Sequence, residues 1–438
     1  MLSLIDCLSL FLERVSVMAY NSVIQFFLIM EVLMQNYPKV TITKKAEKTV
    51  KDGFPWVYDT EVSVGENIND GGVVYVYSEK DRYLGTGFYN SASKLRVRFV
   101  TRNSNDIIDR EFWKRKIRWA FDYRKQVMGD DFGCCRLIFG DSDGFPGLTV
   151  DRYDDVLCAE VLNLGIDRIK DTLFEIMTDT LKDMGETVTA VWERSTGKNR
   201  QLEGLDDSVG FRLTESLGTD VSRKEVVVNE NGLKIRVDFV DGQKTGYFLD
   251  QKYNHAAAAR YSRGKKVLDC CTHTGGFALN CAAAGAERVL GIDISAAAVE
   301  EADRNAKMNR LVNISFEKHD VFDYLTEHAA SGDRQWDFII LDPPAFTKSR
   351  NTVKSASAGY EKINYLAMKL LPRGGYLVTC SCSRFMTPEL FEKTVAKAAD
   401  EAGVRLRLIE KRGASPDHPV LLGAPDTEYL KCFIYQVI

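Results

Sequence analysis

The sequence lacks the signatures of several large classes of protein. Its ten cysteines include no CxxC pair, which argues against the usual zinc and dithiol sites. Two adjacent pairs, Cys134-Cys135 and Cys270-Cys271, do not resemble a disulfide framework, so we interpret the thiols as reduced and intracellular. Neither GxGxxG nor GxxxxGKS/T occurs, which disfavours a pyrophosphate cradle and a P-loop. The sequence therefore predicts a cytoplasmic protein with no metal site.

Long apolar runs are also scarce. Within the first 36 residues the longest charge-free run, residues 15–30, is shorter than the ~20 residues that a membrane span needs. That run also contains Asn21 and Gln25, and no basic amino-terminus with a small-residue cleavage site precedes it. We expect residues 1–36 to form an amphipathic helical extension, with Met34 as a candidate natural start. A membrane anchor is the alternative interpretation.

The charge is close to balanced, with a net value of −4 over 438 residues. Basic residues nevertheless gather in two short segments, for which a solvated surface is the ordinary explanation. Arg96 and Arg98 alternate, so on a strand they would lie on one side and suit phosphate contacts. The two segments contain Lys44, Lys45, Lys48 and Lys51, and Lys94, Arg96, Arg98 and Arg102.

The length and the hydrophobic pattern predict three folded regions after the extension. Short alternating strands with turn signals predict a small β-barrel at residues 37–104. Residues 105–225 read as a central α/β region in which residues 185–223 are largely polar. Residues 226–438 begin with a hairpin at 226–240, shared with the central region, and then alternate strand and helix. This alternation predicts a Rossmann-like, doubly wound parallel sheet.

Acidic residues follow three successive strands of that sheet. Asp269 begins a turn that contains Gly275 and Gly276, and Asp293 ends the next strand about 17 residues later. Asp320 follows the third strand. An acid in the second position commonly accepts hydrogen bonds from ribose hydroxyls, and one in the third could meet an adenine amino group. Each acid alone is more often a cap or turn residue, but the three together predict S-adenosylmethionine.

Two further motifs end neighbouring strands. Residues 342–346 read Asp-Pro-Pro-Ala-Phe after the apolar run 338–341, and residues 379–383 read Thr-Cys-Ser-Cys-Ser after residues 376–378. A carboxylate, a proline-stiffened turn and a thiol at adjacent strand ends predict chemistry on a flat base.

Together these motifs resemble those of one family. The chain is similar to the class I S-adenosylmethionine-dependent methyltransferases of cytosine C5 in large-subunit ribosomal RNA that carry an N-terminal PUA domain. The resemblance covers about residues 37–438. It implies a PUA barrel at residues 37–104, ribosomal RNA as the partner, and S-adenosylmethionine as the cofactor. Cys271 and His273 stand where the wider class often has glycine. The further matching segments are residues 54–57, 140–147, 242–251 and 274–277.

The resemblance also implies roles for individual residues. Cys382 matches the family's nucleophile better than Cys380, although an ordinary cysteine is a small buried hydrophobe. Asp342 would hold the cytosine edge, Phe346 would stack on or wall the base, and residues 244–251 would line the cofactor pocket. The expected cofactor-binding residues are Tyr247, Asp250, Gln251, Asp269, Thr272, Thr274, Gly275, Gly276, Asp293, Asp320, Asp342 and Pro343.

A thiol at this position has a chemical rationale. Cytosine C5 is a weak nucleophile, but attack of a thiolate on C6 turns C5 into an enamine-like carbon that accepts a methyl group. The target base must be unpaired or flipped out to be reached. Two alternatives stay open: a class I RNA methyltransferase that acts on a nitrogen of guanine or adenine without a thiol, and a non-catalytic RNA-binding assembly factor. The resemblance is also compatible with a homodimer.

Overall fold

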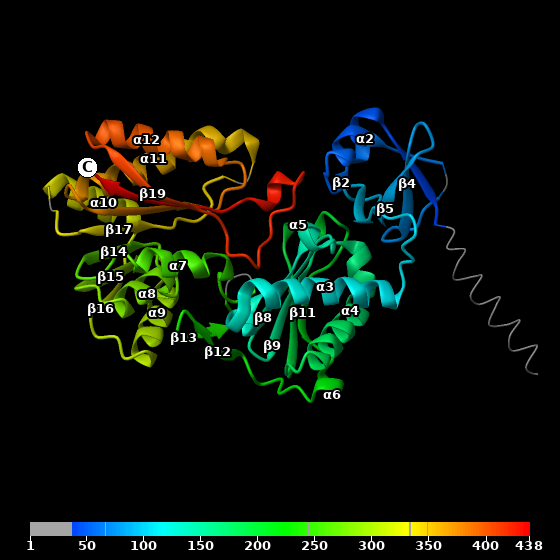
Figure 1. The fold of residues 1–438 in the computed structure, drawn as a ribbon, viewed down its shortest axis with the longest axis horizontal. Helices are drawn as coiled ribbons and strands as arrows, with labels where there is room; N and C mark the ends of the chain where they lie inside the picture. Colours follow the sequence, from blue (N-terminus) through cyan, green and yellow to red (C-terminus); the bar gives the residue numbers. More distant parts are fainter. Residues whose placement is uncertain (1–36, 66, 243–244, 333, 348) are drawn as a thin grey trace, which may run out of the picture.

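The structure is a computed structural model that describes residues 37–438, apart from residues 66, 243–244, 333 and 348. The described chain forms four sheets, and Figure 1 shows three of them as separate bodies with a hairpin between the second and third. The predictions for residues 1–36 lie outside the described residues. No described helix is long and apolar enough to cross a membrane.

The first body is a six-stranded, barrel-like sheet with the order β2-β6-β5-β4-β1-β3, and it agrees with the predicted amino-terminal β region. Its helix α2 begins where the Thr43 hydroxyl accepts the Ala46 N–H, and it buries Ala46 and Val50 while its lysines face solvent. The elements are β1 (Lys39–Ile42), α2 (Lys44–Lys51), β2 (Trp56–Val57), β3 (Val62–Val64), β4 (Val73–Ser78), β5 (Tyr83–Tyr89) and β6 (Val97–Thr101).

The two alternating arginines of this body do not form a phosphate-binding pair. Arg98 forms an ion pair with Glu203 at 2.9 Å, and only 13% of its side chain is exposed. The Arg96 guanidinium donates to the carbonyl oxygens of Asn90 and Ser91. The prediction of a joint phosphate contact is therefore wrong, because both side chains hold the protein itself together.

The second body is a five-stranded sheet with the order β11-β10-β9-β8-β7, covered by α3 and α4. The sequence analysis treated residues 185–223 as largely polar and therefore did not predict β10 and β11. The charged residues of β10 look like surface residues in the sequence, although one of them is buried. Glu193 on β10 is fully buried and forms ion pairs with Lys170 and Arg212. The elements are α3 (Arg110–Met128), β7 (Cys134–Phe139), β8 (Leu148–Tyr153), β9 (Val156–Val161), α4 (Leu164–Asp183), β10 (Ala190–Ser195), α5 (Lys198–Gln201), β11 (Ser208–Arg212) and α6 (Thr214–Leu217).

The predicted hairpin consists of β12 (Glu225–Glu230) and β13 (Leu233–Asp238). Its two turn residues, Asn231 and Gly232, have φ values of 53° and 83°, as a tight hairpin turn requires. One face packs its valines and isoleucine into a core shared with the second body and with α8 and α9. The hairpin thus joins the second body to the third, the seven-stranded sheet.

The third body is a seven-stranded sheet with the order β16-β15-β14-β17-β18-β20-β19. Its strands are parallel except β20, which pairs antiparallel with both β18 and β19. The prediction of a wholly parallel sheet missed this strand, whose almost continuous burial is that of a parallel strand and gives no sign of its antiparallel direction. The strands are β14 (Lys266–Cys270), β15 (Arg288–Asp293), β16 (Ile314–Lys318), β17 (Phe338–Leu341), β18 (Tyr376–Ser381), β19 (Leu406–Arg412) and β20 (Lys431–Val437).

Helices cover both faces of this sheet, which confirms the doubly wound prediction. One core cluster joins the sheet to α10, α11 and α12, and another joins it to α7 and α8. The sequence did not indicate α10 or α12. The helices are α7 (Lys252–Ala259), α8 (Gly276–Ala283), α9 (Ala296–Met308), α10 (Val321–Ser331), α11 (Val353–Leu370) and α12 (Pro388–Ala402).

The segment between β19 and β20, residues 413–430, connects the three bodies. The Tyr123 hydroxyl of α3 donates to the Pro416 carbonyl (2.8 Å), and the backbone N–H of Arg136 donates to Asp417 (2.8 Å). In Figure 1 this red segment extends from the seven-stranded sheet toward the central and first bodies. The same segment contributes walls to both hollows described below.

Candidate active site

A cavity of about 420 Å³ lies beyond the carboxyl ends of β14, β15, β17 and β18. The strand order reverses at β14 and β17, and open α/β sheets bind their ligands at such a point. Several of the sequence-predicted residues meet here, although they come from distant parts of the chain. Those that line the cavity are Asp250, Gln251, Asp293, Asp320, Asp342, Pro343 and Cys382.

Two of these acids also hold the loops that follow their strands. Asp293 accepts the backbone N–H groups of His273 (3.0 Å) and Ser295 (2.9 Å). Asp320 caps α10 by accepting the N–H of Phe322 at 2.8 Å. The ordinary explanation of such acids as caps is therefore correct, yet both also face the cavity. A carboxylate has more acceptor positions than these bonds occupy, so each acid can still accept a bond from a ligand.

Asp269 lies beneath the turn after β14 and does not line the cavity. Its Oδ2 accepts the Thr272 hydroxyl (2.6 Å) and the Ala278 N–H (3.0 Å). Its Oδ1 is buried and has no hydrogen-bond partner among the described residues. Burial raises the pKa of Asp269 to about 7, and the charge of Asp342 adds to this rise. A buried acceptor without a donor is costly, and the cost is lower for the neutral, protonated carboxyl than for the carboxylate.

The turn after β14 has an unusual backbone. Cys271 and His273 have φ values of 63° and 51°, in the left-handed region that favours glycine. These are the positions at which the sequence departs from the wider class. Next to them, a Cβ on Gly276 would come within 2.4 Å of the His255 ring, so a side chain is excluded there.

His255 is a buried residue that the sequence did not indicate. Its Nδ1 lies 2.7 Å from a carboxylate oxygen of Glu230, and the Tyr247 hydroxyl donates to the same oxygen at 3.2 Å. Burial disfavours the charged ring, but the negative charge of Glu230 outweighs it and raises the pKa of His255. This group supports the start of α8 from below, at one side of the turn.

The other predicted cofactor residues do not line the cavity. Tyr247, Thr272, Thr274, Gly275 and Gly276 are absent from its wall. Tyr247 is buried against the hairpin, and the Thr274 carbonyl accepts the Asn305 side chain at 3.2 Å. These residues belong to the turn after β14 or lie near it, without lining the cavity. Their role as direct cofactor contacts stays a prediction, and Lys244 lies outside the described residues.

The two candidate thiols have opposite surroundings. Cys380 is fully buried within β18, opposite Cys432 of β20, and does not line the cavity. Burial, together with the neighbouring Cys432 thiol, raises the pKa of Cys380 well above its usual range. Cys382 follows the end of the strand, is partly exposed and lines the cavity. Of the two candidate thiols, Cys382 is therefore the one that faces the cavity.

Asp342 and Phe346 flank the thiol on the neighbouring strand end. Asp342 follows β17, and its backbone N–H donates to the Cys270 carbonyl at 3.3 Å. The Phe346 ring lies 4.5 Å from the Tyr360 ring and 6.1 Å from the Phe322 ring, so it is fixed as part of the wall. A flat ligand could meet a carboxylate, an aromatic ring and a thiol at once.

Sequence reasoning missed part of the apolar wall. Most of them lie in a loop or at a helix start, where no periodic pattern identifies them, and one lies within α11. They are Ile294, Val321, Phe322 and Leu430, together with Ile363 of α11. Phe248 also lines the cavity, and it belongs to the segment 244–251 that the resemblance assigned to the pocket. Leu430 comes from a segment that reaches the cavity only through tertiary structure, so no local signal could have indicated it.

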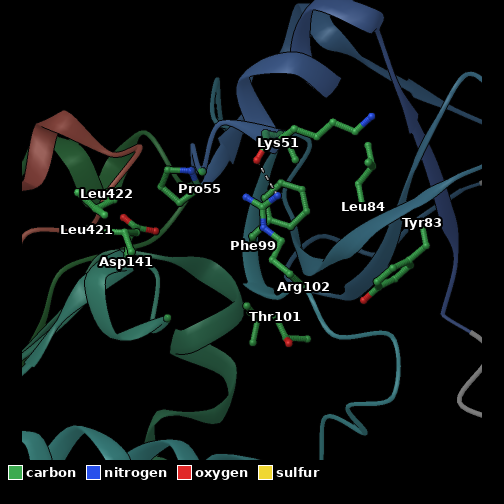
Figure 2. Close-up of a pocket in the computed structure, with 14 residues that line it drawn as sticks. Lys51, Pro55, Tyr83, Leu84, Phe99, Thr101, Arg102, Asp141, Leu421 and Leu422 are labelled. Carbon is green, nitrogen blue, oxygen red and sulfur yellow. Dashed lines mark hydrogen bonds between the residues drawn. The ribbon is translucent and has the colours of Figure 1, made fainter.

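A second hollow, a groove of about 530 Å³, lies between the first body and residues 421–422 (Figure 2). Arg102 forms part of its wall. The Arg102 guanidinium donates to the carbonyl oxygens of Val50 (3.0 Å) and Phe54 (2.9 Å) and lies 4.0 Å from the centroid of the Phe99 ring. An arginine fixed in this way offers a planar, cationic face, which is a common platform for an RNA base.

The fold and the cavity define a class I methyltransferase that carries a further domain at its amino-terminal side. A sequence model described as S-adenosylmethionine-dependent methyltransferase matches residues 146–432, and one described as PUA-like domain matches residues 40–102. A protein from Streptococcus mutans, described as a SAM-dependent methyltransferase, has the same fold, with a TM-score of 0.75 over 91% of this chain and 100% of its own, at 23% identity. A solved methyltransferase complexed with SAH gives a TM-score of 0.77 over the same shares.

Closer sequence relatives extend over almost the whole chain. Ribosomal RNA large subunit methyltransferase I of Pseudoalteromonas atlantica is 37% identical over 405 residues, which cover 91% of this chain and 99% of the relative. The protein of the same name from Shewanella denitrificans is 36% identical over 407 residues, with the same coverage. This chain belongs to that family of S-adenosylmethionine-dependent methyltransferases, and S-adenosylmethionine is its cofactor.

Proposed function

We propose that this protein methylates C5 of a cytosine in large-subunit ribosomal RNA, and that Cys382 forms a covalent bond to C6 during the reaction. The observation that carries the proposal is the placement of the Cys382 thiol in one cavity with Asp342 and the strand-end acids. Cys380, the other thiol of the motif, is buried in the sheet. The relatives named for a large-subunit ribosomal RNA methyltransferase support the choice of substrate.

The residues around the cavity fit the proposed cofactor. Gln251 lines the cavity, and its buried Nε2 donor has no hydrogen-bond partner among the described residues. This donor fits the carboxylate of an amino acid. We assign the ribose hydroxyls to Asp293 and the adenine amino group to Asp320. When bound, S-adenosylmethionine supplies an electrophilic methyl group on a sulfonium.

The residues of the chain then carry out the following steps. The Cys382 thiolate adds its electron pair to C6, and the electrons of the C5–C6 double bond become available at C5. The Asp342 carboxylate accepts a hydrogen bond from the 4-amino group of the base, or from N3 when N3 is protonated, and Phe346 covers its plane. After methylation the C5 proton passes to water, its bonding electrons form the C5–C6 double bond again, and the sulfur of Cys382 is expelled as a thiolate.

The geometry also sets a requirement on the RNA. A base stacked in a duplex cannot enter a cavity at a strand edge, so we infer that the target cytosine is unpaired or flipped out. The Arg102 and Phe99 platform in the groove would then hold a second, unpaired nucleotide of the same strand. The segment 413–430 contributes Leu421 and Leu422 to the groove and Leu430 to the cavity, so it borders both proposed contacts.

The experiment measures transfer of a labelled methyl group from S-adenosylmethionine to large-subunit ribosomal RNA, followed by mapping of the modified base. We expect 5-methylcytosine. Cys382→Ala should lower the rate on the order of 10³-fold or more, because a group that acts as the nucleophile has no substitute. Cys380→Ala is the matched control, since it removes a thiol two residues away that is buried in the sheet, and it should retain activity.

The outcomes separate the proposal from its rivals. Full activity of Cys382→Ala, or methyl transfer to a ring or exocyclic nitrogen of a purine, would rule out the covalent C5 mechanism. Absence of any methyl transfer in the presence of RNA binding would favour a non-catalytic assembly factor. Incubation with RNA that contains 5-fluorocytosine provides a direct readout, because fluorine cannot leave as a proton and the Cys382 adduct should accumulate.

A further inference from the structure

A buried lysine lies behind the turn that carries Cys382. Lys431 begins β20, in register with Ser381 at the end of β18, and is 2% exposed. Its ammonium donates to the carbonyl oxygens of Ser383 (2.8 Å) and Tyr429 (2.7 Å). Lys431 therefore contacts both sequence neighbours of Cys382. It pairs with Ser381 across the two strands, and its ammonium donates to the Ser383 carbonyl.

The surroundings of this lysine are unusual for a buried charge. Both acceptors are neutral carbonyl oxygens, whereas buried ammonium groups normally need a counter-charge. Burial lowers the pKa of Lys431 to about 8, and negative charge on Cys382 and on Glu428 acts in the opposite direction. An anion that forms on the Cys382 sulfur would thus stabilise the buried cation, and the cation would stabilise that anion.

We propose that Lys431 is a positioning residue that holds the turn after β18 and stabilises the thiolate form of Cys382. This inference rests on the proposed function, in which Cys382 is the nucleophile. The thiolate is the reactive form of a cysteine, and a nearby cation increases its fraction at neutral pH. The thiol proton passes to water, the sulfur keeps the electron pair that later forms the bond to C6, and the same cation stabilises the sulfur when it is expelled.

Other charged and titratable groups face the thiol, and most of them oppose ionisation. Carboxylates in the same cavity disfavour a second negative charge. The Tyr360 hydroxyl is engaged by the hydroxyls of Ser381 and Ser383, each at 3.0 Å. Arg384 is a further cation, but it is exposed and paired with Asp426. The acids that line the cavity are Asp250 from the segment before α7, Asp293 after β15, Asp320 before α10 and Asp342 after β17.

Cys271 and His273 from the turn after β14 also line the cavity, whose wall carries four carboxylates. Lys431 is thus a buried cation on the thiol side of this wall. Removal of its charge should leave the repulsion by the carboxylates less compensated, so the pKa of the thiol should rise. Lys431→Met keeps the length of the side chain and removes the charge. Lys411→Met on the adjacent strand β19 is the matched control, because Lys411 is exposed and lies against Glu392 rather than near the thiol.

The test measures the rate at which iodoacetamide alkylates Cys382 in the full chain between pH 6 and pH 10, by mass spectrometry of the peptide that contains it. In the unchanged protein we expect a midpoint below about 8.5, the usual value for cysteine. Lys431→Met should raise the midpoint by about one unit, which lowers the rate at pH 7.5 on the order of tenfold. Lys411→Met should leave it unchanged.

Two results would overturn the inference: a midpoint at or above 8.5 in the unchanged protein, or an unchanged midpoint in a folded Lys431→Met variant. The first needs no substitution, so the inference stays testable even if Lys431→Met does not fold. Alkylation requires neither RNA nor methyl transfer. Failure of the proposed function, seen as full activity of Cys382→Ala, is therefore distinguishable from failure of the role of Lys431.

Discussion

The catalytic cavity and the groove beside the first sheet carry opposite charge. Four carboxylates line the cavity, whereas Lys51 and Arg102 line the groove, with Asp141 on its opposite side. An acidic cavity suits a cofactor that carries a positive sulfonium, and a basic groove suits a phosphate backbone. The net charge of −4 is therefore an average over two sites with different ligands. Substitutions in one site should leave binding at the other unchanged.

The largest effect is expected at Asp342, where the two ligands meet. Asp342→Asn keeps the shape of the side chain but removes the charged acceptor for the cytosine edge. We expect methyl transfer to fall by about 10²–10³-fold, as for the loss of one well-placed polar group in an active site. Single-turnover rates with saturating cofactor and RNA measure this. A fall in RNA affinity of the same size, with an unchanged rate at saturation, would instead make Asp342 a binding residue.

A smaller effect is expected at Asp293, on the cofactor side of the comparison. Asp293→Ala removes the proposed ribose acceptor, and loss of hydrogen bonds to a charged group should weaken binding by about 10–100-fold. Calorimetric titration with S-adenosylmethionine measures the dissociation constant. Asp303→Ala on α9 is the control, because Asp303 is an exposed acid that pairs with Lys307 and does not line the cavity. Equal losses in both variants would contradict the assignment.

On the groove side, the expected change appears in RNA affinity alone. The double substitution Lys51→Gln, Arg102→Gln removes two cations and the platform over Phe99. RNA binding at low salt should weaken by about 3–30-fold, and the dependence of affinity on salt should become shallower. The affinity for S-adenosylmethionine should not change. An unchanged salt dependence would show that phosphates lie elsewhere on the surface.

The two sites also differ in how far the sequence could predict them. Strand-end motifs predicted the cavity well, because buried apolar runs identify the strands and topology then brings Asp293, Asp342 and Cys382 to one edge. The groove was not predictable in this way. The alternation of Arg96 and Arg98 suggested a phosphate site, but Glu203 lies 105 residues from Arg98 in sequence and only the fold brings the two together.

The antiparallel strand β20 shows the same limit. Its residues are nearly all buried, as in a parallel strand, so the sequence does not reveal the antiparallel direction, which follows from the pairing with β18 and β19. Lys431 begins this strand and is covered by carbonyl groups from two separate segments. A lysine in a sequence reads as a surface residue, and its burial behind Cys382 follows from tertiary packing alone.

The smallest expected effect is a change of folding stability with pH, which arises from the buried carboxyl group of Asp269. Its pKa is raised to about 7 in the folded protein from an ordinary value near 3.9 in the unfolded chain. Between these values the folded state binds more protons, so stability should fall as pH rises, by at most about 1.4 kcal/mol per pH unit. In the cofactor-free protein we expect the melting temperature to drop by a few degrees between pH 5 and pH 7. Asp269→Asn should flatten this slope, while an equally steep slope in that variant would assign it to other groups.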